Sequence, residues 1–236
     1  MSIEDAKKKA GYKAVDNHIK DKMVLGIGSG STVVYAVQRL VQRVKEEKLD
    51  IICIPTSFQS YQLITNNNLK LGNLDSIEKI HVDIDGADEI DEKLNVIKGG
   101  GGCHVQEKIV ASNSEELIII ADYRKDSKKL GEKWKKGIPI EVIPLGYIPV
   151  MRKIRSLGGI PTLRMAKNKA GPVVSDNANF IVDADFGIIH EPENLNQKLK
   201  MIPGVVETGL FINNVEVNIP KSYIGTKDGN VIERTR

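Results

Sequence analysis

The sequence has few cysteines and no long apolar run, and both shortages exclude whole classes of protein. Only two of the 236 residues are cysteine, Cys53 and Cys103, and no Cys-x-x-Cys pair occurs. This excludes a disulfide framework and a zinc ribbon. The longest unbroken apolar runs, such as 117–121, fall far short of the roughly 20 residues that span a membrane. The first 22 residues are charged and lack the apolar centre of a signal peptide. We therefore expect a soluble, reduced, cytoplasmic protein with no membrane contact.

The sequence also lacks a strong excess of charge of either sign. Lysine and arginine number 34 and aspartate and glutamate 31, which leaves a net charge of +3. That balance does not favour a nucleic-acid partner, although it is compatible with a small anionic substrate. Hydrophobic residues make up 41% and charged residues 28%, as in ordinary globular proteins. The length suits one large domain or two small ones.

Two kinds of apolar pattern alternate along the first 125 residues. Short apolar runs predict buried strands at 23–28, 50–56, 79–85, 95–99 and 116–122. Helical spacing predicts helices at 3–20, 33–48, 57–66 and 105–112. Strands that alternate with helices indicate an α/β fold whose parallel sheet has helices on both faces.

The pattern changes near residue 130. Proline, glycine and polar turns separate short strands at 138–144, 160–165 and 180–185, and a helix follows at 192–202. This is an α+β pattern. We expect a large domain of residues 1–129 plus 202–236 and a smaller α+β domain of residues 130–201, which contributes to oligomer contacts.

Polar loops follow each predicted strand of the parallel sheet, where such sheets bind their ligands. The loops are 28–32, 56–57, 85–88, 98–102 and 122–125. We expect them to converge on one cleft.

The first of these loops lies in the sequence GIGSGST, residues 26–32. A dinucleotide fingerprint requires a glycine where Ser31 stands and an acidic residue after the second strand, and both are missing. A Walker loop requires a lysine, which is also missing. A site for a single phosphate fits better, with hydroxyls from the loop and the positive end of a helix that begins near Ser31. The alternative is a tight turn in which Ser31 caps that helix.

The second cluster begins with the carboxylates of DGADEIDE, residues 85–92. The spacing does not match a calcium loop, because its fifth position is Ala87 and its glycine comes too early. Asp85 and Asp88 also suit Mg²⁺, and this alternative stays open at this point. The other acidic residues of the segment are expected to be exposed to solvent: Glu89, Asp91 and Glu92.

Four consecutive glycines, residues 99–102, follow Lys98. Bare backbone and a fixed positive charge can stabilise an oxygen that becomes negative during a reaction. Glu107 lies in the first turn of the next predicted helix, and a carboxylate beside an oxyanion site can remove a proton next to a carbonyl. The alternative for Glu107 is a helix N-terminal residue that matches the helix dipole. Cys103 and His104 are adjacent, so their side chains point in different directions, and a nucleophile–base dyad is not predicted.

These motifs, taken together and in order, resemble the family of ribose-5-phosphate isomerase, type A. The matching segments are GIGSGST, DGADEID, IKGGGG with Glu107, IIIADYRK, PIEVIP, GPVVSDNANFIVD, IPGVVETGLF and IGTKDG. The resemblance implies interconversion of ribose 5-phosphate and ribulose 5-phosphate in the pentose phosphate pathway, without metal or organic cofactor. It also implies a Rossmann-like large domain and a homodimer or dimer of dimers, with a small phosphosugar as the partner molecule.

The resemblance also implies residue roles. Glu107 would move a proton between C2 and C1 through a cis-enediolate, and Lys98 with the amides of the glycine run would stabilise the enediolate oxygen. Asp85 would assist ring opening, and Asp88 would hold sugar hydroxyls. The substrate site would be lined by Ser29, Gly30, Ser31, Thr32, Asp85, Gly86, Ala87, Asp88, Lys98, Gly99, Gly100 and Gly101, with Lys7 and Lys125 completing phosphate binding.

Two departures from the family pattern are visible. Arg124 stands where the family commonly has serine, next to Lys125, and Cys103-His104-Val105-Gln106 replaces a segment that is often Ala-Ala-Leu-Thr-Arg or similar. Two other functions remain open on the residues alone. One is a non-catalytic sugar-phosphate sensor that acts through a DNA-binding partner, and the other is an enzyme for another sugar phosphate, such as an aminosugar deaminase.

Overall fold

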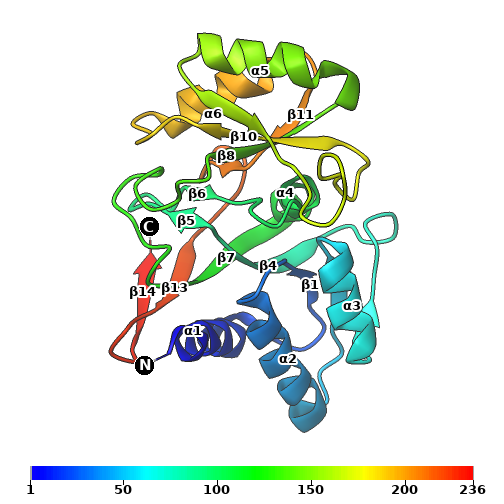
Figure 1. Ribbon diagram of the computed structural model, residues 1–236. Coiled ribbons are helices and arrows are strands. Elements are labelled where there is room, and N and C mark those ends of the chain that lie inside the picture. The colour runs from blue at the N-terminus through cyan, green and yellow to red at the C-terminus, as the bar shows by residue number, and fades with distance from the viewer. Residues whose placement is uncertain (1, 236) are drawn as a thin grey trace. The chain divides into compact units, whose positions relative to one another are not determined.

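The computed structural model describes residues 2–235, which form two compact units (Figure 1). The first unit contains the chain up to Ala87, residues 106–126 and the chain from Asn213. The second unit contains Asp88–Val105 and Ser127–Ile212. The predicted domains divide the chain differently, since 88–105, 127–129 and 202–212 group with the second unit. Strand pairing explains the two longer differences, because 88–105 and 202–212 supply strands to sheets of that unit.

The first unit holds the predicted parallel sheet. Its strands are β1 (Val24–Ile27), β2 (Ile52–Pro55), β3 (Lys70–Leu71), β4 (Ile80–Gly86), β7 (Ser114–Asp122), β13 (Lys221–Gly225) and β14 (Val231–Thr235). The order is β14-β13-β7-β4-β1-β2-β3, and every neighbouring pair is parallel except β13 with β14. The structure thus confirms a Rossmann-like α/β fold with a parallel sheet.

Helices cover both faces of this sheet. They are α1 (Ile3–His18), α2 (Val33–Glu47), α3 (Phe58–Asn66) and α4 (His104–Ser112), the last of which begins in the second unit and continues into the first. Alternate strand residues point to opposite faces, so Leu25 and Ile84 meet α1 and α2 in the main apolar core. On the other face, a Cβ added to Gly26 would overlap Asp83 and Val110 of α4. Helix α4 therefore packs on the face that carries the β4 aspartates.

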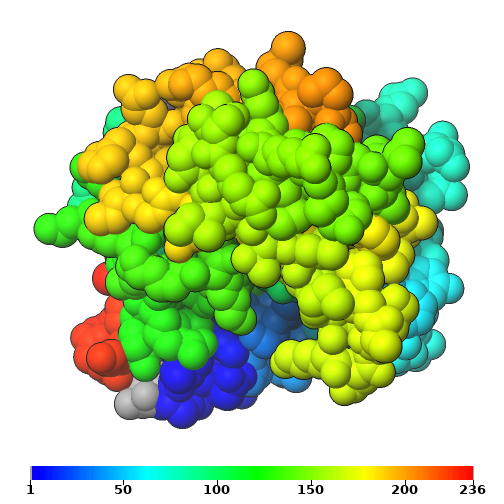
Figure 2. Space-filling view, turned by 45° about the horizontal axis from the view of Figure 1, so that its top comes forward, coloured from blue at the N-terminus to red at the C-terminus, as the bar shows by residue number. Residues whose placement is uncertain are grey.

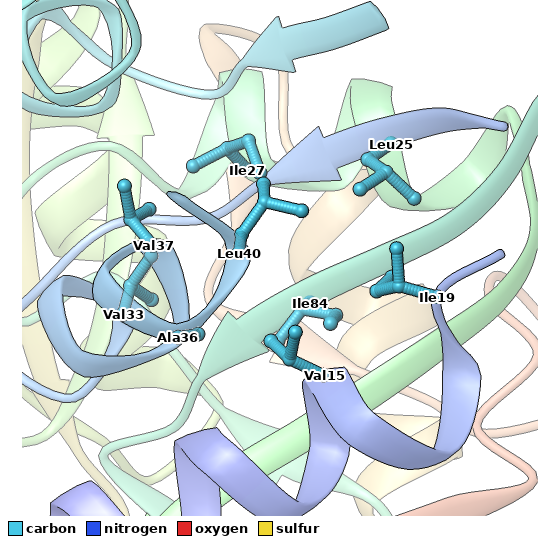
Figure 3. A pocket seen from close by; sticks show the side chains of 9 residues that line it. All are labelled: Val15, Ile19, Leu25, Ile27, Val33, Ala36, Val37, Leu40 and Ile84. Carbon is cyan, nitrogen blue, oxygen red and sulfur yellow. The ribbon is translucent and has the colours of Figure 1, made fainter. Parts of the chain in front are cut away.

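The apolar core between α1, α2, β1 and β4 encloses a small cavity of about 10 Å³ (Figure 3). Its lining is entirely aliphatic: Val15, Ile19, Leu25, Ile27, Val33, Ala36, Val37, Leu40 and Ile84. A space of this size and lining offers a water molecule no hydrogen-bond partner. The cavity is therefore a packing defect of the core.

The second unit is the predicted α+β domain. Its strands are β5 (Glu89–Ile90), β6 (Val96–Ile97), β8 (Ile138–Val142), β9 (Ile160–Leu163), β10 (Phe180–Asp185), β11 (Val205–Thr208) and β12 (Leu210–Phe211). They form antiparallel sheets of order β11-β8-β10-β9 and β12-β6-β5. The strand predicted at 95–99 for the parallel sheet is β6, so its placement there is wrong, because β6 pairs antiparallel with β5 and β12. The helical elements are η1 (Pro144–Gly146), α5 (Tyr147–Ser156) and α6 (Pro192–Lys200).

Helix α5 is absent from the predicted elements. Its first turn contains Pro149, which reads as a breaker in the sequence but is tolerated there because the first turn needs no intrahelical N–H donors. The buried side chains Val150 and Ile154 then pack into the core of the second unit. Within residues 2–235, no helix has both the length and the apolar character needed to span a bilayer.

Two of the three acidic residues expected in solvent are buried. Glu92 is exposed as predicted, but Glu89 and Asp91 are buried. Glu89 accepts hydrogen bonds from the hydroxyl of Ser127 and the amides of Gly131 and Lys133, each at 2.6 Å. The expectation of exposure is wrong because it treats these carboxylates as surface charges, whereas Glu89 anchors the 127–133 loop.

Candidate active site

The loop after β1 is shaped by glycine and leads directly into α2. Gly30 has φ +105°, a conformation that other residues rarely adopt, and it lies exposed with Ser31. Helix α2 starts at Val33, and Thr32 is its N-cap residue, with no capping hydrogen bond from its side chain. The alternative in which Ser31 caps the helix is therefore wrong. The exposed loop precedes the positive end of α2, as a phosphate site requires.

The end of β2 supports this loop. The hydroxyl of Ser29 lies 2.9 Å from that of Thr56 and donates to that of Ser57 at 2.6 Å. The amide of Gly30 donates to the side-chain oxygen of Gln59 at 2.8 Å. The predicted meeting of loops 28–32 and 56–57 is confirmed. No motif in the sequence marks Gln59, and only its place in the first turn of α3 brings it to the loop.

Asp85 is the carboxylate at the end of β4, and its side chain is fully buried. Its Oδ1 accepts the amide of Ser29 at 2.9 Å and the amide of Gly86 at 2.6 Å. A Cβ at Gly28 would overlap the Asp85 carboxylate, so only glycine leaves room for it. The Ser29 amide and the bare Gly28 therefore join the β4 carboxylate to the loop after β1.

Glu107 lies in the first turn of α4 and is only 5% exposed. Helix α4 connects β4 to β7, which are parallel neighbours, so it runs back across the sheet and begins at the edge where the strands end. Val110 places α4 on the Asp83 and Asp85 face. Glu107 therefore shares a sheet face and edge with Asp85. Its place in the first turn also fits the alternative of a helix N-terminal residue that matches the helix dipole.

Two predicted phosphate contacts also belong to the first unit. Lys7 on α1 is 8% exposed, and its Nζ lies 2.8 Å from Oε1 of Glu4. The amide of Lys125, just after β7, donates to the carbonyl of Asp122 at 3.0 Å. Arg124 donates to both carboxylate oxygens of Asp122, at 2.7 and 2.9 Å. The departure at Arg124 thus makes a bidentate pair with a buried carboxylate.

Burial and Arg124 shift the pKa of the Asp122 carboxyl in opposite directions. Burial would raise the pKa of the Asp122 carboxyl, but the hydrogen bonds and charge of Arg124 outweigh it and lower that pKa. The hydrogen bond to Asp122 in turn raises the pKa of the Arg124 guanidinium. The pair therefore stays ionised at neutral pH.

Gly86 and Ala87 also lie in the first unit, whereas Asp88 and the residues 98–101 lie in the second. Lys98 is 3% exposed, its amide donates to the carbonyl of Gly209 at 2.8 Å, and its Nζ lies 5.5 Å from the ring centre of Phe211. The carboxylate of Asp88 accepts the amide of Gly100 at 2.6 Å. The prediction assigns that amide to the enediolate oxygen, whereas in the structure it donates to Asp88.

The glycine run is a tight turn. Gly99 and Gly102 have φ +94° and +84°, and the amide of Gly102 donates to the carbonyl of Gly99 at 2.9 Å. His104 is buried beneath Gly99, where an added Cβ would overlap the imidazole. Its Nε2 lies 3.4 Å from the carbonyl oxygen of Glu207, whereas Cys103 Sγ points to the carbonyl of Gly101 at 3.7 Å. As expected, the two side chains have separate partners.

A metal site is not evident in the described part of the chain. No cluster of three or more histidine, cysteine, aspartate or glutamate side chains among residues 2–235 could hold an ion. The geometry instead offers two buried carboxylates, a phosphate-type loop and a lysine followed by glycine amides.

Comparison with known proteins decides the family. The family model for ribose 5-phosphate isomerase A, also called phosphoriboisomerase A, matches residues 52–229. The chain belongs to the ribose 5-phosphate isomerase A family. Proteins named ribose-5-phosphate isomerase from Sus scrofa and Homo sapiens are each 57% identical over 99% of this chain, covering 75% and 74% of their own lengths. The Dictyostelium discoideum protein of that name is 54% identical and covers 97% of both chains.

Solved members of the isomerase family have the same fold. Ribose 5-phosphate isomerase A from Methanocaldococcus jannaschii matches with a TM-score of 0.91 and 42% identity, covering all of both chains. A D-ribose-5-phosphate isomerase in complex with phospho-erythronic acid matches with a TM-score of 0.92 and 36% identity, again over both whole chains. The α/β architecture with a smaller α+β unit is thus the fold of ribose 5-phosphate isomerase A.

Proposed function

We propose that the protein interconverts D-ribose 5-phosphate and D-ribulose 5-phosphate in the non-oxidative pentose phosphate pathway. The observation that carries this proposal is the pair of buried carboxylates, Asp85 and Glu107, at the strand-end edge beside an exposed Gly-Ser loop. The relatives named ribose-5-phosphate isomerase, similar over nearly the whole chain, support the same reaction.

In the proposed mechanism Glu107 is the base. It takes a proton from C2 of the open-chain aldose, which leaves a cis-enediolate with its negative charge on O1. The hydroxyl proton of O2 passes to O1, and Glu107 returns its proton to C1, which gives the ketose. Asp85 assists opening of the furanose ring, and the two amides that donate to its Oδ1 fix its orientation. Burial of both carboxylates excludes water and strengthens their electrostatic interactions with a bound sugar.

The negative oxygen of the enediolate requires preorganised donors. We assign this role to Lys98 with the amides of Gly99, Gly100 and Gly101. Asp88, which accepts the Gly100 amide, is assigned to the sugar hydroxyls. Binding would then exchange the Gly100 amide between Asp88 and the substrate, while the amide of Gly101 has no acceptor among the described residues.

The phosphate is assigned to the loop 29–32, with Lys7 and Lys125 adding positive charge. A phosphate held far from the reacting carbons supplies binding energy and orientation for the proton transfer. Gly86 and Ala87 follow Asp85 directly and are assigned to the substrate contact surface. Side chains and amides thus provide a base, an oxyanion stabiliser and a phosphate anchor, so we propose catalysis without metal or organic cofactor.

The test is conversion of ribose 5-phosphate to ribulose 5-phosphate by metal-stripped protein, with Glu107→Gln in parallel. A lost general base costs about 100- to 10,000-fold in kcat, while substrate binding should largely remain. Glu46→Gln, on the exposed side of α2, is the matched control and should behave as the wild type.

The outcomes separate the reaction from the residue roles. Turnover by the wild type and the Glu46→Gln control, but not by Glu107→Gln, supports both the reaction and the role of Glu107 as base. Turnover by Glu107→Gln at the wild-type rate keeps the reaction and rejects the base. No turnover by any of the three proteins rejects the reaction, and ammonia release from an amino-sugar phosphate would then indicate a deaminase. Tight binding of duplex DNA would instead favour a sensor.

We further propose a homodimer, or a dimer of dimers, formed through the second unit. Large apolar side chains are exposed there around η1 and the start of α5: Ile143, Leu145 and Ile148, with Met201 and Val206 near Gly204, which contacts this turn. Figure 2 shows the yellow-green segment that includes α5 at the surface, next to orange segments from the later part of this unit. Leu145 is 94% exposed, an arrangement typical of an interaction surface.

Leu145→Glu should shift the mass measured by light scattering towards the monomer, whereas Leu74→Glu, in the first unit, should not. An unchanged mass for both would reject this surface.

We also propose a cytoplasmic location. Its support is the metabolic reaction and the chemistry of the cysteines, since neither Cys53 nor Cys103 forms a disulfide. Burial raises the pKa of the Cys53 thiol to about 12, which keeps it protonated and unreactive. Fractionation of cells with an antibody to the protein tests the location, and recovery outside the cytosolic fraction would reject it.

A further inference from the structure

The glycine run poses a structural problem for the proposed mechanism. Glycine loses more conformational entropy on folding than any other residue, so four in sequence do not hold a defined turn by themselves. Donors for an enediolate must nevertheless be in place before the reaction. Something outside residues 99–102 must therefore fix their peptide planes.

Arg164 makes the required contacts. Its Nη1 donates to the carbonyl oxygen of Gly99 at 3.0 Å and to that of Gly100 at 3.2 Å. A Cβ at Gly102 would lie 3.7 Å from the same nitrogen, so the guanidinium also packs beside the end of the turn. One side chain thus bonds to the backbone of the run at two of its four glycines.

The two carbonyls are bonded to the amides that the mechanism uses. The Gly99 carbonyl belongs to the same planar peptide unit as the Gly100 amide, and the Gly100 carbonyl to the same unit as the Gly101 amide. A hydrogen bond from a cation to such a carbonyl fixes the plane and polarises the N–H on its other side. Arg164 therefore orients these amides and strengthens them as donors without contacting substrate itself.

The guanidinium is itself held in place. Arg164 Nε and Nη2 donate to the two carboxylate oxygens of Asp183 at 2.8 and 2.5 Å. Both side chains are largely buried, 16% and 17% exposed, unlike an ordinary surface pair. The Arg164 amide donates to the carbonyl of Ile181 at 2.9 Å, which ties its backbone to β10. The sheet of the second unit thus provides a rigid base for the turn.

We propose that Arg164, oriented by Asp183, is a positioning residue for isomerisation that fixes and polarises the amides of the glycine run. The inference rests on the proposed function, since it assigns those amides to the enediolate. Lysine cannot replace Arg164, because one ammonium cannot bind a carboxylate at two points while bonding two carbonyls.

The test compares Arg164→Lys and Arg164→Ala with the wild type on ribose 5-phosphate. Misplaced catalytic donors lower the rate about 100-fold, so we expect kcat to fall by about this factor while KM changes far less. Millimolar methylguanidine should restore part of the kcat of Arg164→Ala, but not that of Arg164→Lys, whose ammonium occupies the space. Arg155→Lys, on the exposed face of α5, is the matched control and should match the wild type.

The readouts separate positioning from general stability. A purely structural role would lower the melting temperature and the folded fraction, with kcat per folded molecule unchanged and no effect of methylguanidine. That result, or wild-type kcat in Arg164→Lys, overturns the proposal. If neither Arg164 variant folds, kcat is measured for Asp183→Asn instead, because this variant keeps the Arg164 cation but weakens the contacts that hold it. A wild-type kcat in Asp183→Asn overturns the proposal. Wild type and Glu107→Gln are assayed together, so an inactive wild type counts against the proposed function instead.

Discussion

Gly28 leaves the space that the Asp85 carboxylate occupies, since any Cβ at Gly28 would overlap that carboxylate. The two residues lie at the ends of neighbouring parallel strands, and the Gly28 amide donates to the carbonyl of Ile84 at 3.0 Å. This close approach allows Asp85 Oδ1 to accept the Ser29 amide. A bare residue in one strand therefore sets the position of a buried carboxylate in the next.

Gly28→Ala should consequently impair activity more than folding. The added methyl group must displace Asp85, which we expect to cost about 1–3 kcal/mol of stability as overpacking. A displaced catalytic group should lower kcat about 100-fold. Both are measured by urea denaturation and by initial rates with ribose 5-phosphate. In Gly146→Ala, where a Cβ would meet only an ordinary contact at 3.5 Å, neither quantity should change much. Wild-type kcat in Gly28→Ala would contradict the role given to Asp85.

Glu89 should be important for stability but not for chemistry. Both of its buried oxygens accept hydrogen bonds from the 127–133 loop. Glu89→Gln replaces one acceptor by an NH₂ group that faces backbone donors, which should cost about 1–3 kcal/mol of unfolding free energy. The kcat per folded molecule should stay unchanged. The exposed Glu92→Gln is the control, and equal stability of the two variants would show that the anchor contributes nothing.

The pair of Asp122 and Arg124 should make stability depend on pH in the acid range. Burial opposes the shift, but Arg124 holds the pKa of Asp122 below its ordinary value, so the folded-state pKa lies below that of the unfolded chain. The pair therefore stabilises the fold above the unfolded pKa of about 3.9, and this contribution is lost as the pH falls through the folded-state pKa.

Arg124→Ser removes the pair and introduces the residue common in the family. At pH 7 we expect a melting temperature lower by about 2–4 °C, which corresponds to roughly 1 kcal/mol for a partly exposed pair. The difference in melting temperature should vanish when the pH is below the folded-state pKa of Asp122. Arg152→Ser, on the exposed surface of α5, should follow the wild type throughout. A constant difference at every pH would show that packing, not charge, is responsible.

The core cavity of about 10 Å³ should accept one additional methylene (Figure 3). Val37 lines it from α2, and Val37→Ile should raise the unfolding free energy by up to about 0.8 kcal/mol. Val215→Ile adds the same group at a residue that is 55% exposed and should have little effect. Chemical denaturation of both variants checks this. A less stable Val37→Ile would mean that the strain of fitting the longer side chain exceeds its burial.

The sequence by itself determined four strands of the parallel sheet, β1, β2, β4 and β7, most helices and the polar loops that follow these four strands. These follow from local periodicity, because a buried strand needs an apolar run and a surface helix needs an apolar stripe. It also marked Lys98 and Glu107 as catalytic candidates from their place beside the glycine run, and the resemblance to the isomerase family added Asp85. Residue order was sufficient for these conclusions.

The tertiary structure alone decided the partners of individual side chains. Glu89 looks like a surface charge until the 127–133 loop brings three donors to it. Nothing near Arg164 in sequence connects it to glycines some sixty residues away, and only the pairing of β9 with β10 puts its guanidinium between Asp183 and their carbonyls. The division of the chain at residues 88–105 likewise depends on β5, β6 and β12. Contacts between distant segments follow from how sheets pair and pack, and local residue patterns do not encode them.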